Sequence, residues 1–580
     1  MSDLEGRARA WIADDPDPST RAELERLLAD PSAEAKAELK DRFAGRLRFG
    51  TAGLRGAVAA GPNRMNQAVV RTATAALAAW LDEHVPASRQ AGVVVGCDAR
   101  HGSAEFDEEV AVVLTGAGFH VHLLERQRPT PMLAFAVPHL GAAAGVMITA
   151  SHNPPADNGY KLYLGDGAQI VPPVDEEIEA LMDGVGPLLA VPTGDLAGPL
   201  VIHHSREVQD EFVRALVRES PAPAGADALT IVYTPLHGVA LSTMESALHR
   251  AGFPPPVVVP AQAEPDPDFP TVAFPNPEEP GAMDLALREA KRVGADVVIA
   301  NDPDGDRLAV AVQNSSVPSG WQLLRGDEIG SLLGAYVLER TAGDPEPETR
   351  LVATSIVSSS LLSKIAAAAG VRYAETLTGF KWIVRAPERL PGSRFVFGYE
   401  EALGYSVGTV VRDKDGIGAA LSFLGLVVTA RKKGHNVLEL LDDLAIRHGV
   451  HLTSQLSIHS ESPESTMASL RAHPPTTLGR PITHTVDLLA PTPAEESLGL
   501  PPSDVLIYRL SGARIVVRPS GTEPKLKIYF EVVRPVSGEA AAPGGGDLAE
   551  AKASAAAELS VLHDAVSALL SPLTGQQVAS

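Results

Sequence analysis

Three aspartates on alternate residues form the densest group of potentially reactive or metal-binding side chains in the sequence. Asp302, Asp304 and Asp306 follow the apolar run 297–300, which predicts a buried strand that ends in an acidic turn. Three carboxylates so close together repel one another, and a bound divalent cation relieves that repulsion. Because all the ligands are oxygens, the pattern favours Mg²⁺ over zinc.

Two other acidic motifs begin in a similar way. An EF-hand loop requires glycine at its sixth position and glutamate at its twelfth, but counting from Asp302 these positions hold Arg307 and Gln313. A haloacid-dehalogenase-type phosphatase would use Asp302 as a nucleophile, and it commonly has threonine or valine where this chain has Asp306. The calcium loop is excluded, and the phosphatase stays open as an alternative.

A second reactive segment, 149–154, follows the apolar run 145–148 and places Ser151 at the end of a predicted strand. A serine hydroxyl needs a neighbouring base to become a nucleophile, and His152 and Lys161 are the candidates for proton transfer. A phosphorylated serine would carry nearly two negative charges and would need cations around it. Ser151 is therefore the candidate covalent centre.

Four further segments carry groups that bind phosphates or sugar hydroxyls. A glycine-rich turn at 50–56 presents an arginine, two adjacent glutamates follow a strand, and a basic turn offers hydroxyls and backbone N–H groups. A lysine after a Thr-Gly turn could bind a phosphate or assist proton transfer. The residues are Arg55; Thr378, Gly379 and Lys381; Glu400 and Glu401; and Arg518, Ser520, Gly521, Thr522 and Lys525.

Four segments resemble the signature loops of the α-D-phosphohexomutase superfamily, which includes the phosphoglucomutases and phosphomannomutases. In chain order they are 149–154, 302–307, 398–405 and 518–525. The resemblance covers about residues 45–535. It implies that Ser151 carries the phosphoryl group and completes a Mg²⁺ site with the three aspartates. It also implies that Glu400 and Glu401 bind the sugar, that Arg55, Arg307 and the 518–525 turn hold phosphates, and that the 378–381 loop lies over the substrate.

The implied activity is the interconversion of glucose 1-phosphate and glucose 6-phosphate through a bisphosphorylated intermediate, with glucose 1,6-bisphosphate as activator. The loop 398–405 lacks the serine of many members and resembles the phosphoglucomutase-2 and phosphopentomutase-like branch. Mannose and pentose phosphates therefore stay open as substrates. A sugar-phosphate binding protein without catalysis is a further alternative.

Composition limits the possible partners. The net charge of −23 disfavours binding to nucleic acid or to an anionic membrane surface. The longest charge-free run near the middle, 417–430, is too short to cross a bilayer, and the first residues do not resemble a signal peptide. One cysteine, Cys97, fits a reducing compartment. We expect a cytoplasmic monomer or weak homodimer that binds a small sugar phosphate.

The reactive loops require a scaffold of strands and helices. Apolar runs followed by helical spacing predict an α/β protein with three successive mixed-sheet domains and a smaller C-terminal α+β domain around a central cleft. The expected domains are 1–205, 206–322, 323–445 and 446–580, and the first 45 residues are expected to form two helices. The hypothesis requires an accessible Ser151 hydroxyl close to the three aspartates.

Overall fold

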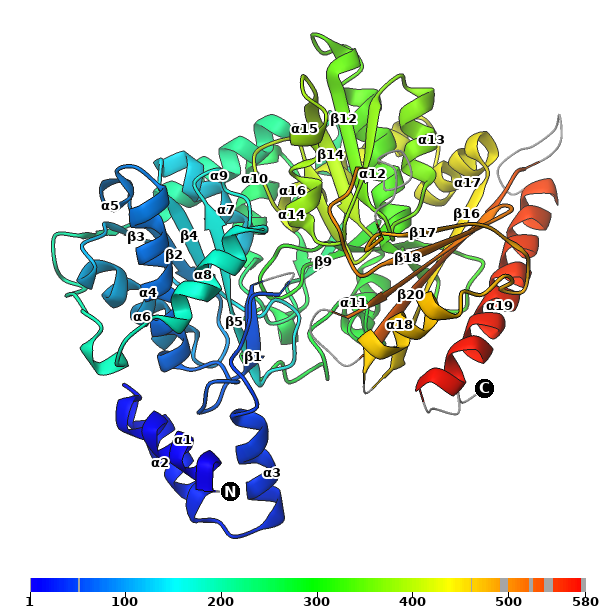
Figure 1. Ribbon diagram of the computed structural model, residues 1–580. Coiled ribbons are helices and arrows are strands. Elements are labelled where there is room, and N and C mark those ends of the chain that lie inside the picture. Colours follow the sequence, from blue (N-terminus) through cyan, green and yellow to red (C-terminus); the bar gives the residue numbers. More distant parts are fainter. Residues whose placement is uncertain are drawn as a thin grey trace. The chain divides into compact units, whose positions relative to one another are not determined.

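The computed structural model describes residues 2–50, 53–460, 462–490, 499–520, 525–536 and 546–574. The chain divides into two compact units, and each unit takes two stretches of chain. Unit 1 consists of Met1–Leu323 and Ser406–Gly425, and unit 2 consists of Leu324–Tyr405 and Leu426–Ser580. Figure 1 shows that sheets covered by helices recur through both units, which confirms the predicted α/β class.

Three helices, rather than the predicted two, precede the first sheet: α1 (Ser2–Asp14), α2 (Pro18–Ala29) and α3 (Ala33–Arg42). The side chains of Asp17 and Ser32 each accept a backbone N–H at the start of a helix. These two N-caps divide the expected continuous pattern, because each begins a new helix. Ala8, Leu24 and Leu39 are buried in a small core of their own.

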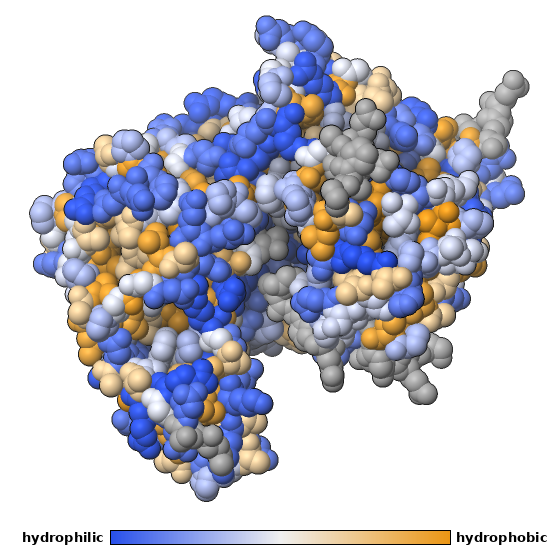
Figure 2. Space-filling view, viewed as in Figure 1, coloured by the Kyte–Doolittle hydropathy of each residue, from blue (hydrophilic) through white to orange (hydrophobic). Residues whose placement is uncertain are grey.

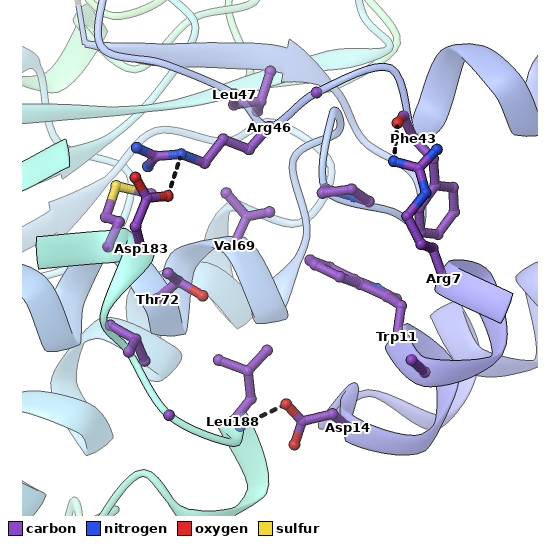
Figure 3. A pocket seen from close by; sticks show the side chains of 16 residues that line it. Arg7, Trp11, Asp14, Phe43, Arg46, Leu47, Val69, Thr72, Asp183 and Leu188 are labelled. Carbon is purple, nitrogen blue, oxygen red and sulfur yellow. Dashed lines mark hydrogen bonds and ion pairs between the residues drawn. The ribbon is translucent and has the colours of Figure 1, made fainter. Parts of the chain in front are cut away.

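A cavity of about 680 Å³ lies between α1 and the first sheet domain in unit 1 (Figure 3). Trp11, Phe43, Val69 and Leu188 supply apolar walls. Asp14 accepts the backbone N–H of Leu188 at 2.8 Å, so this carboxylate ties α1 to the far wall.

A six-stranded mixed sheet, in the order β1-β5-β4-β2-β3-β6, forms the base of the Ser151 site. Strands β2, β3, β4 and β6 are parallel, and β5 runs antiparallel to both β1 and β4. Helices α4, α6 and α8 contribute buried residues to one core with this sheet. The strands are β1 (Leu54–Ala57), β2 (Val93–Cys97), β3 (Val121–Leu123), β4 (Ala144–Ile148), β5 (Asp157–Leu164) and β6 (Val201–His203), and the helices are α4 (Gln67–His84), α5 (Ser88–Ala91), α6 (Ser103–Gly116), α7 (Thr130–Leu140) and α8 (Val174–Asp183).

A five-stranded sheet, in the order β11-β10-β9-β7-β8, supports the acidic loop in the same unit. Its central strand β9 (Val297–Ala300) is fully buried, as the apolar run predicts, and the acidic turn follows it. The other elements are α9 (Arg206–Glu219), β7 (Ile231–Thr234), α10 (Leu241–Ala251), β8 (Val257–Val258), α11 (Asp284–Val293), β10 (Ala309–Gln313) and β11 (Trp321–Leu323).

Unit 2 holds a four-stranded sheet, β13-β12-β14-β15, and a five-stranded antiparallel sheet, β16-β20-β19-β18-β17. Loops of the former pack on the latter: Ile356, Val357 and Leu377 share a core with Ile507 and Tyr529. The end of β15 and the first part of α16 belong to the stretch Ser406–Gly425 of unit 1. The elements after Leu323 are α12 (Gly326–Arg340), β12 (Arg350–Ser355), α13 (Leu361–Ala368), β13 (Arg372–Thr376), α14 (Phe380–Ile383), α15 (Ala386–Arg389), β14 (Arg394–Glu400), β15 (Gly404–Val407), α16 (Gly416–Lys432), α17 (Val437–His448), β16 (Val450–His459), α18 (Pro463–Ala472), β17 (Ile482–Asp487), β18 (Leu506–Leu510), β19 (Ala513–Pro519), β20 (Lys525–Arg534) and α19 (Gly546–Thr574).

Helix α19 covers the antiparallel sheet and contacts β16 and β20. Among the described helices, it is the one whose length and apolar composition would suffice to cross a membrane. Leu548, Leu562, Val566 and Leu570 are buried in the core of this sheet domain, so one face of the helix is covered by protein. On the face shown in Figure 2, hydrophilic residues are widespread and apolar residues are interspersed among them.

Candidate active site

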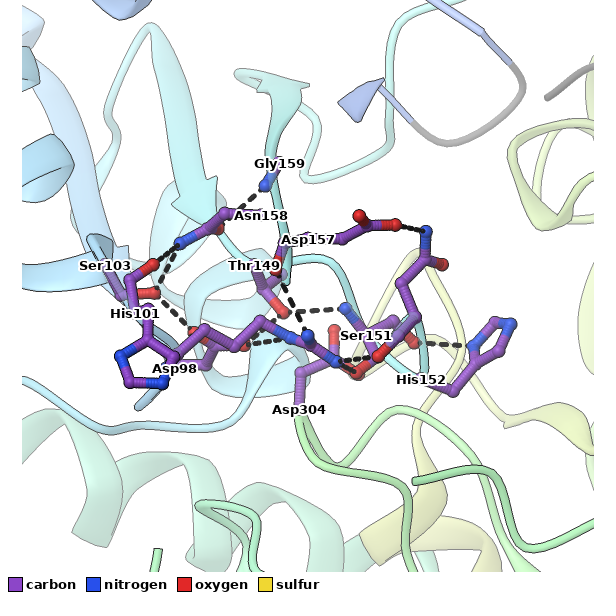
Figure 4. A network of polar contacts seen from close by, with 12 residues as sticks. Asp98, His101, Ser103, Thr149, Ser151, His152, Asp157, Asn158, Gly159 and Asp304 are labelled. Carbon is purple, nitrogen blue, oxygen red and sulfur yellow. Dashed lines mark hydrogen bonds and ion pairs between the residues drawn. The ribbon is translucent and has the colours of Figure 1, made fainter. Parts of the chain in front are cut away.

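Ser151 lies just beyond the carboxyl end of β4, as the sequence predicts. Its φ of 53° is in the left-handed region, which a serine adopts only where its surroundings hold it. The Ser151 N–H donates to Thr149 Oγ1 at 2.9 Å, and the Thr149 hydroxyl donates to Asp98 Oδ2 at 2.7 Å. Figure 4 shows this network around the turn.

Arg100 binds the backbone of the same turn. Its guanidinium donates to the carbonyl oxygens of Ser151 at 2.6 Å, Asn153 at 2.7 Å and Pro154 at 2.9 Å. Asp98 lies 3.3 Å from the Arg100 guanidinium, and both side chains are buried. The sequence analysis gave neither residue a role, although both follow the buried strand β2 at its carboxyl end, which is a signal for a site residue.

The Ser151 hydroxyl donates to Asp302 Oδ2 at 2.6 Å and lies 3.1 Å from His152 Nδ1. The expected proximity of the serine to the acidic turn is therefore confirmed. The expected accessibility is wrong for this structure, because Ser151 is 1% exposed. The left-handed turn and the Arg100 contacts direct the hydroxyl toward Asp302 rather than toward solvent.

The three aspartates lie together, as the sequence predicts, and all are fully buried. One oxygen from each lies within 4.8 Å of the others. Asp304 Oδ1 and Asp306 Oδ1 are buried and accept no hydrogen bond from the described residues. Buried carboxylate oxygens without donors suit a hard divalent cation, so this site fits Mg²⁺.

Two lysines neutralise part of this charge. Lys161 Nζ lies 2.6 Å from Asp304 Oδ2 and 2.8 Å from Asp306 Oδ2. Lys414 Nζ lies 3.3 Å from Asp306 Oδ2, and it comes from the stretch that returns to unit 1. The sequence analysis gave Lys414 no role, and nothing in the local sequence points to this long-range contact.

Burial and neighbouring charges shift the pKa values of the three aspartates in different directions. Burial, with Asp304 and Asp306 nearby, raises the pKa of Asp302 to about 8. Burial alone would also raise the pKa of Asp306, but Lys161 and Lys414 outweigh it and lower that pKa. Burial would lower the pKa of Lys161, yet Asp304 and Asp306 raise it. The two lysines therefore favour the ionised form of Asp306, and the aspartates favour the ammonium form of Lys161.

His152 and Arg55 lie beside this group. Burial, with Arg307 and Arg55 nearby, lowers the pKa of His152 well below its usual value, so its ring is neutral. Arg55, on β1, donates to Asn153 Oδ1 at 3.1 Å. The Arg307 backbone N–H donates to Asp302 Oδ1 at 3.0 Å. Unit 1 therefore brings together every predicted site residue that belongs to it.

Unit 2 holds the remaining predicted residues. Ser355, the last residue of β12, and Ser358, in the turn that follows, donate to Glu401 Oε2 at 3.2 Å and 3.0 Å. Burial, with Glu400 and Asp327 nearby, raises the pKa of Glu401 to about 7. Tyr529 Oη lies 3.5 Å from Arg518 Nη1, and burial, with the charge of Glu401 nearby, raises the pKa of this tyrosine. Glu401 and Arg518, which the sequence predicts to bind sugar and phosphate, therefore both lie near Tyr529.

The other predicted residues of unit 2 are placed as follows. Thr378 and Gly379 precede α14, where Gly379 has a φ of 106° and Lys381 is buried. The Ser520 backbone N–H donates to the Lys525 carbonyl at 2.8 Å. Gly521 and Thr522 lie outside the described residues. The predicted cleft would join residues of both units, and it stays a prediction.

Comparison with known proteins identifies the family. The phosphoglucomutase/phosphomannomutase α/β/α domains I, II and III match residues 46–186, 210–316 and 325–445, and the C-terminal domain of the family matches residues 485–540. The chain belongs to the phosphoglucomutase/phosphomannomutase family. The predicted family and the predicted enzyme class are thereby confirmed, and this chain is a phosphomutase of that family.

Relatives of this phosphomutase are named for several sugars. A protein of Haemophilus influenzae named "Probable phosphomannomutase" is 40% identical, over 80% of this chain and 93% of its own. Human phosphopentomutase is 33% identical, over 94% of this chain and 92% of its own. The open form of pp63/parafusin from Paramecium shares the fold, with a TM-score of 0.65 at 18% identity over 92% of this chain and 97% of its own.

Proposed function

We propose that this phosphomutase moves a phosphoryl group between the anomeric and terminal hydroxyls of a sugar monophosphate, through phosphorylated Ser151 and an enzyme-bound bisphosphate. The observation that carries the proposal is the 2.6 Å hydrogen bond from Ser151 Oγ to Asp302 in the acidic group. A phosphoryl group on this serine would lie beside the residues best suited to balance its charge.

Asp302, Asp304 and Asp306, with the phosphate on Ser151, would hold Mg²⁺. The bound cation would neutralise charge on the transferring group. Lys161 and Lys414 already contribute two positive charges at this point, and Arg55 and Arg307 add two more nearby. We propose that these side chains hold the reacting phosphate against the repulsion of the aspartates.

Proton transfer is assigned from the same contacts. The neutral His152 ring lies 3.1 Å from Ser151 Oγ, and it is suited to exchange the serine proton. The pair of aspartates around Lys161 favours its charged form, which suits the donation of a proton to a departing sugar oxygen. The role of proton carrier for Lys161 stays a prediction, as does an assisting role for Lys381.

Transfer also requires the Ser151 turn to move. The hydroxyl is covered in this structure and engaged with Asp302, so a sugar can reach it only after the turn opens. The turn belongs to a left-handed segment held by polar contacts rather than by an apolar core, and such contacts can be exchanged for contacts to a phosphate.

The groups in unit 2 complete the proposal. Glu400 and Glu401 would accept hydrogen bonds from sugar hydroxyls, and the 378–381 loop would cover the sugar. The 518–525 turn, with Arg518, Ser520, Gly521, Thr522 and Lys525, would hold the phosphate that is not reacting. Glucose 1,6-bisphosphate would prime an unphosphorylated serine. We further propose a cytoplasmic monomer or weak homodimer that binds no nucleic acid and no membrane.

Two sugars are proposed, in order. Pentose phosphates come first, because the relative named phosphopentomutase matches 94% of this chain. Glucose phosphates come second, on the resemblance of the 398–405 loop to a branch that includes phosphoglucomutase-2. The sequence analysis predicted glucose phosphates as the substrates, and this stays a prediction. Relative kcat/KM on ribose 1-phosphate, glucose 1-phosphate and mannose 1-phosphate, each with Mg²⁺ and trace bisphosphate, decides between them.

Replacing the nucleophile tests the central step. We expect Ser151→Ala to reduce conversion of the preferred sugar 1-phosphate at least about a thousandfold, because the variant lacks the hydroxyl that we propose carries the phosphoryl group. The product sugar phosphate and free phosphate are measured together, and circular dichroism and Tm report the fold. Exposed Ser205, which is outside the site, provides the control Ser205→Ala.

Each alternative gives a different result in the same assay. Free phosphate released by Ser151→Ala, and abolished by Asp302→Asn, would support the dehalogenase-type phosphatase. Binding of the sugar phosphate without turnover by the wild-type protein would support the sugar-phosphate binding protein. Full isomerase activity in a folded Ser151→Ala variant would contradict the phosphoserine mechanism.

A further inference from the structure

The loop that carries Glu400 and Glu401 contains no serine or threonine between residues 398 and 405. A carboxylate that binds sugar hydroxyls needs donors of its own to hold one orientation, and here they come from another segment. Ser355 ends β12, Ser358 lies in the turn after it, and both donate to Glu401 Oε2. Their hydroxyls lie 2.9 Å apart, so the two serines also contact each other.

Ser358 closes a ring of hydrogen bonds with Glu401. Its hydroxyl donates to the Glu401 carboxylate and accepts the Glu401 backbone N–H at 3.2 Å. Both serine hydroxyls donate to the same oxygen, Oε2 of Glu401, so Oε1 is the oxygen that we assign to a ligand hydroxyl.

The serine turn is itself fixed from three other elements. Arg514, on β19, donates to the Ser358 carbonyl at 2.6 Å and pairs with Glu531 on β20 at 3.0 Å. Asp327, on α12, accepts the Ser359 backbone N–H at 2.6 Å. These groups are buried, so the contacts are shielded from water and hold the turn firmly. The position of the turn then decides the direction of the Glu401 carboxylate.

We propose that Ser355 and Ser358 are positioning residues that aim Glu401 at the sugar. The inference rests on the proposed function, because it assigns Glu401 to the sugar. The serines would act through Glu401 without touching the substrate. A single dedicated oxygen makes recognition depend on where the sugar hydroxyls lie, so the pair would also influence which sugar is accepted.

Removal of Ser358 tests the proposal. We expect Ser358→Ala to lower kcat/KM for the preferred sugar 1-phosphate about 10- to 100-fold, the range for losing a hydrogen bond to a charged group. The loss should come mainly from a higher KM, and Ser358→Thr should restore most of it. Ser359→Ala is the matched control, because Ser359 lies in the same turn and its hydroxyl donates to Glu531 instead of Glu401.

A pH profile separates positioning from a general loosening of the turn. Glu400 on β14 and Asp327 on α12 face Glu401 as like charges, and Tyr529 on β20 lies nearby with Arg518 beside it. The serine hydroxyls favour the ionised carboxylate, so their loss should move the acidic limb of kcat/KM toward higher pH. Ser359→Ala should leave that limb in place.

The outcomes are distinct. Equal kcat/KM losses and equal pH profiles in Ser358→Ala and Ser359→Ala would overturn the inference, as would unchanged kinetics in Ser358→Ala. If Ser358→Ala does not fold, Ser355→Ala decides in the same way, because it keeps Ser358 in place. Absence of isomerase activity in the wild-type protein would instead reject the proposed function. Failure of this inference and failure of the proposed function therefore give different results.

Discussion

At the scale of single residues, Asp107 on α6 is a carboxyl group without a hydrogen-bond partner among the described residues. It is 0% exposed, and the Arg126 guanidinium lies 3.7 Å away. Burial raises its pKa to about 7, with Arg126 opposing this and Glu108 adding to it. The protonated form is therefore favoured in the folded state.

The sign of the pH effect follows from this shift. Because the folded pKa lies above the unfolded one, the stability linked to Asp107 is complete below about pH 4 and is lost as the pH rises through about 7. The loss is on the order of 4 kcal/mol, since one pKa unit corresponds to about 1.4 kcal/mol. We expect Asp107→Asn to flatten this part of the stability profile, measured by urea unfolding between pH 5 and 8.

Glu105→Gln is the control for this experiment, because Glu105 is exposed on the same helix. Its profile should follow that of the wild-type protein. A wild-type stability that stays constant across this pH range would contradict the prediction, as would an unchanged slope in Asp107→Asn.

At the scale of elements, the turn after β7 supports the acidic turn after β9. The Val239 backbone N–H donates to the Pro303 carbonyl at 2.8 Å, and Gly238 packs against the same residue. A Cβ atom on Gly238 would lie 2.4 Å from Pro303 Cα. A side chain at position 238 therefore requires Pro303 or the turn after β7 to shift, and Pro303 lies between Asp302 and Asp304.

We therefore expect Gly238→Ala to lower Mg²⁺ affinity and kcat/KM at least about tenfold, because small displacements of reacting groups are costly. Mg²⁺ titration followed by calorimetry and by activity measures both effects. Gly186→Ala is the control, since a Cβ there meets nothing within 4 Å. Wild-type Mg²⁺ affinity in a folded Gly238→Ala variant would show that the turn after β7 does not position the aspartates.

At the scale of the whole molecule, unit 1 is completed by a stretch of chain that follows the first part of unit 2. The returning segment 406–425 brings Lys414 to Asp306 and brings Asp413 to Tyr163, whose hydroxyl donates to Asp413 at 2.8 Å. It also carries the first part of α16, where the apolar side chains of Ile417, Leu421, Phe423 and Leu424 are buried.

A fragment of residues 1–323 should therefore fold poorly, because it lacks these buried side chains and the charge of Lys414 beside the aspartates. We expect dye binding to exposed apolar surface and a broad thermal transition. The same fragment joined to residues 406–425 through a flexible linker should recover a cooperative transition. A compact, cooperative 1–323 fragment would show that the returning segment is dispensable for the fold.

The local sequence determined the fold class, the strands β4 and β9 and the reactive residues that follow them. Apolar runs of strand length that end in polar turns are short-range patterns, so Ser151 and the three aspartates could be predicted as site residues from the sequence. The N-terminal helices were misjudged because Asp17 and Ser32 act as N-caps within a continuous helical pattern.

Tertiary structure alone decided the rest. It placed Lys414 beside Asp306, Arg100 beneath the Ser151 turn, and Ser355 with Ser358 on Glu401. It also covered the Ser151 hydroxyl, which the sequence analysis expected to be accessible. These contacts join segments distant in the chain, and their geometry follows from how sheets and loops pack together. A sequence pattern specifies which groups are available, whereas packing specifies which of them meet and which face water.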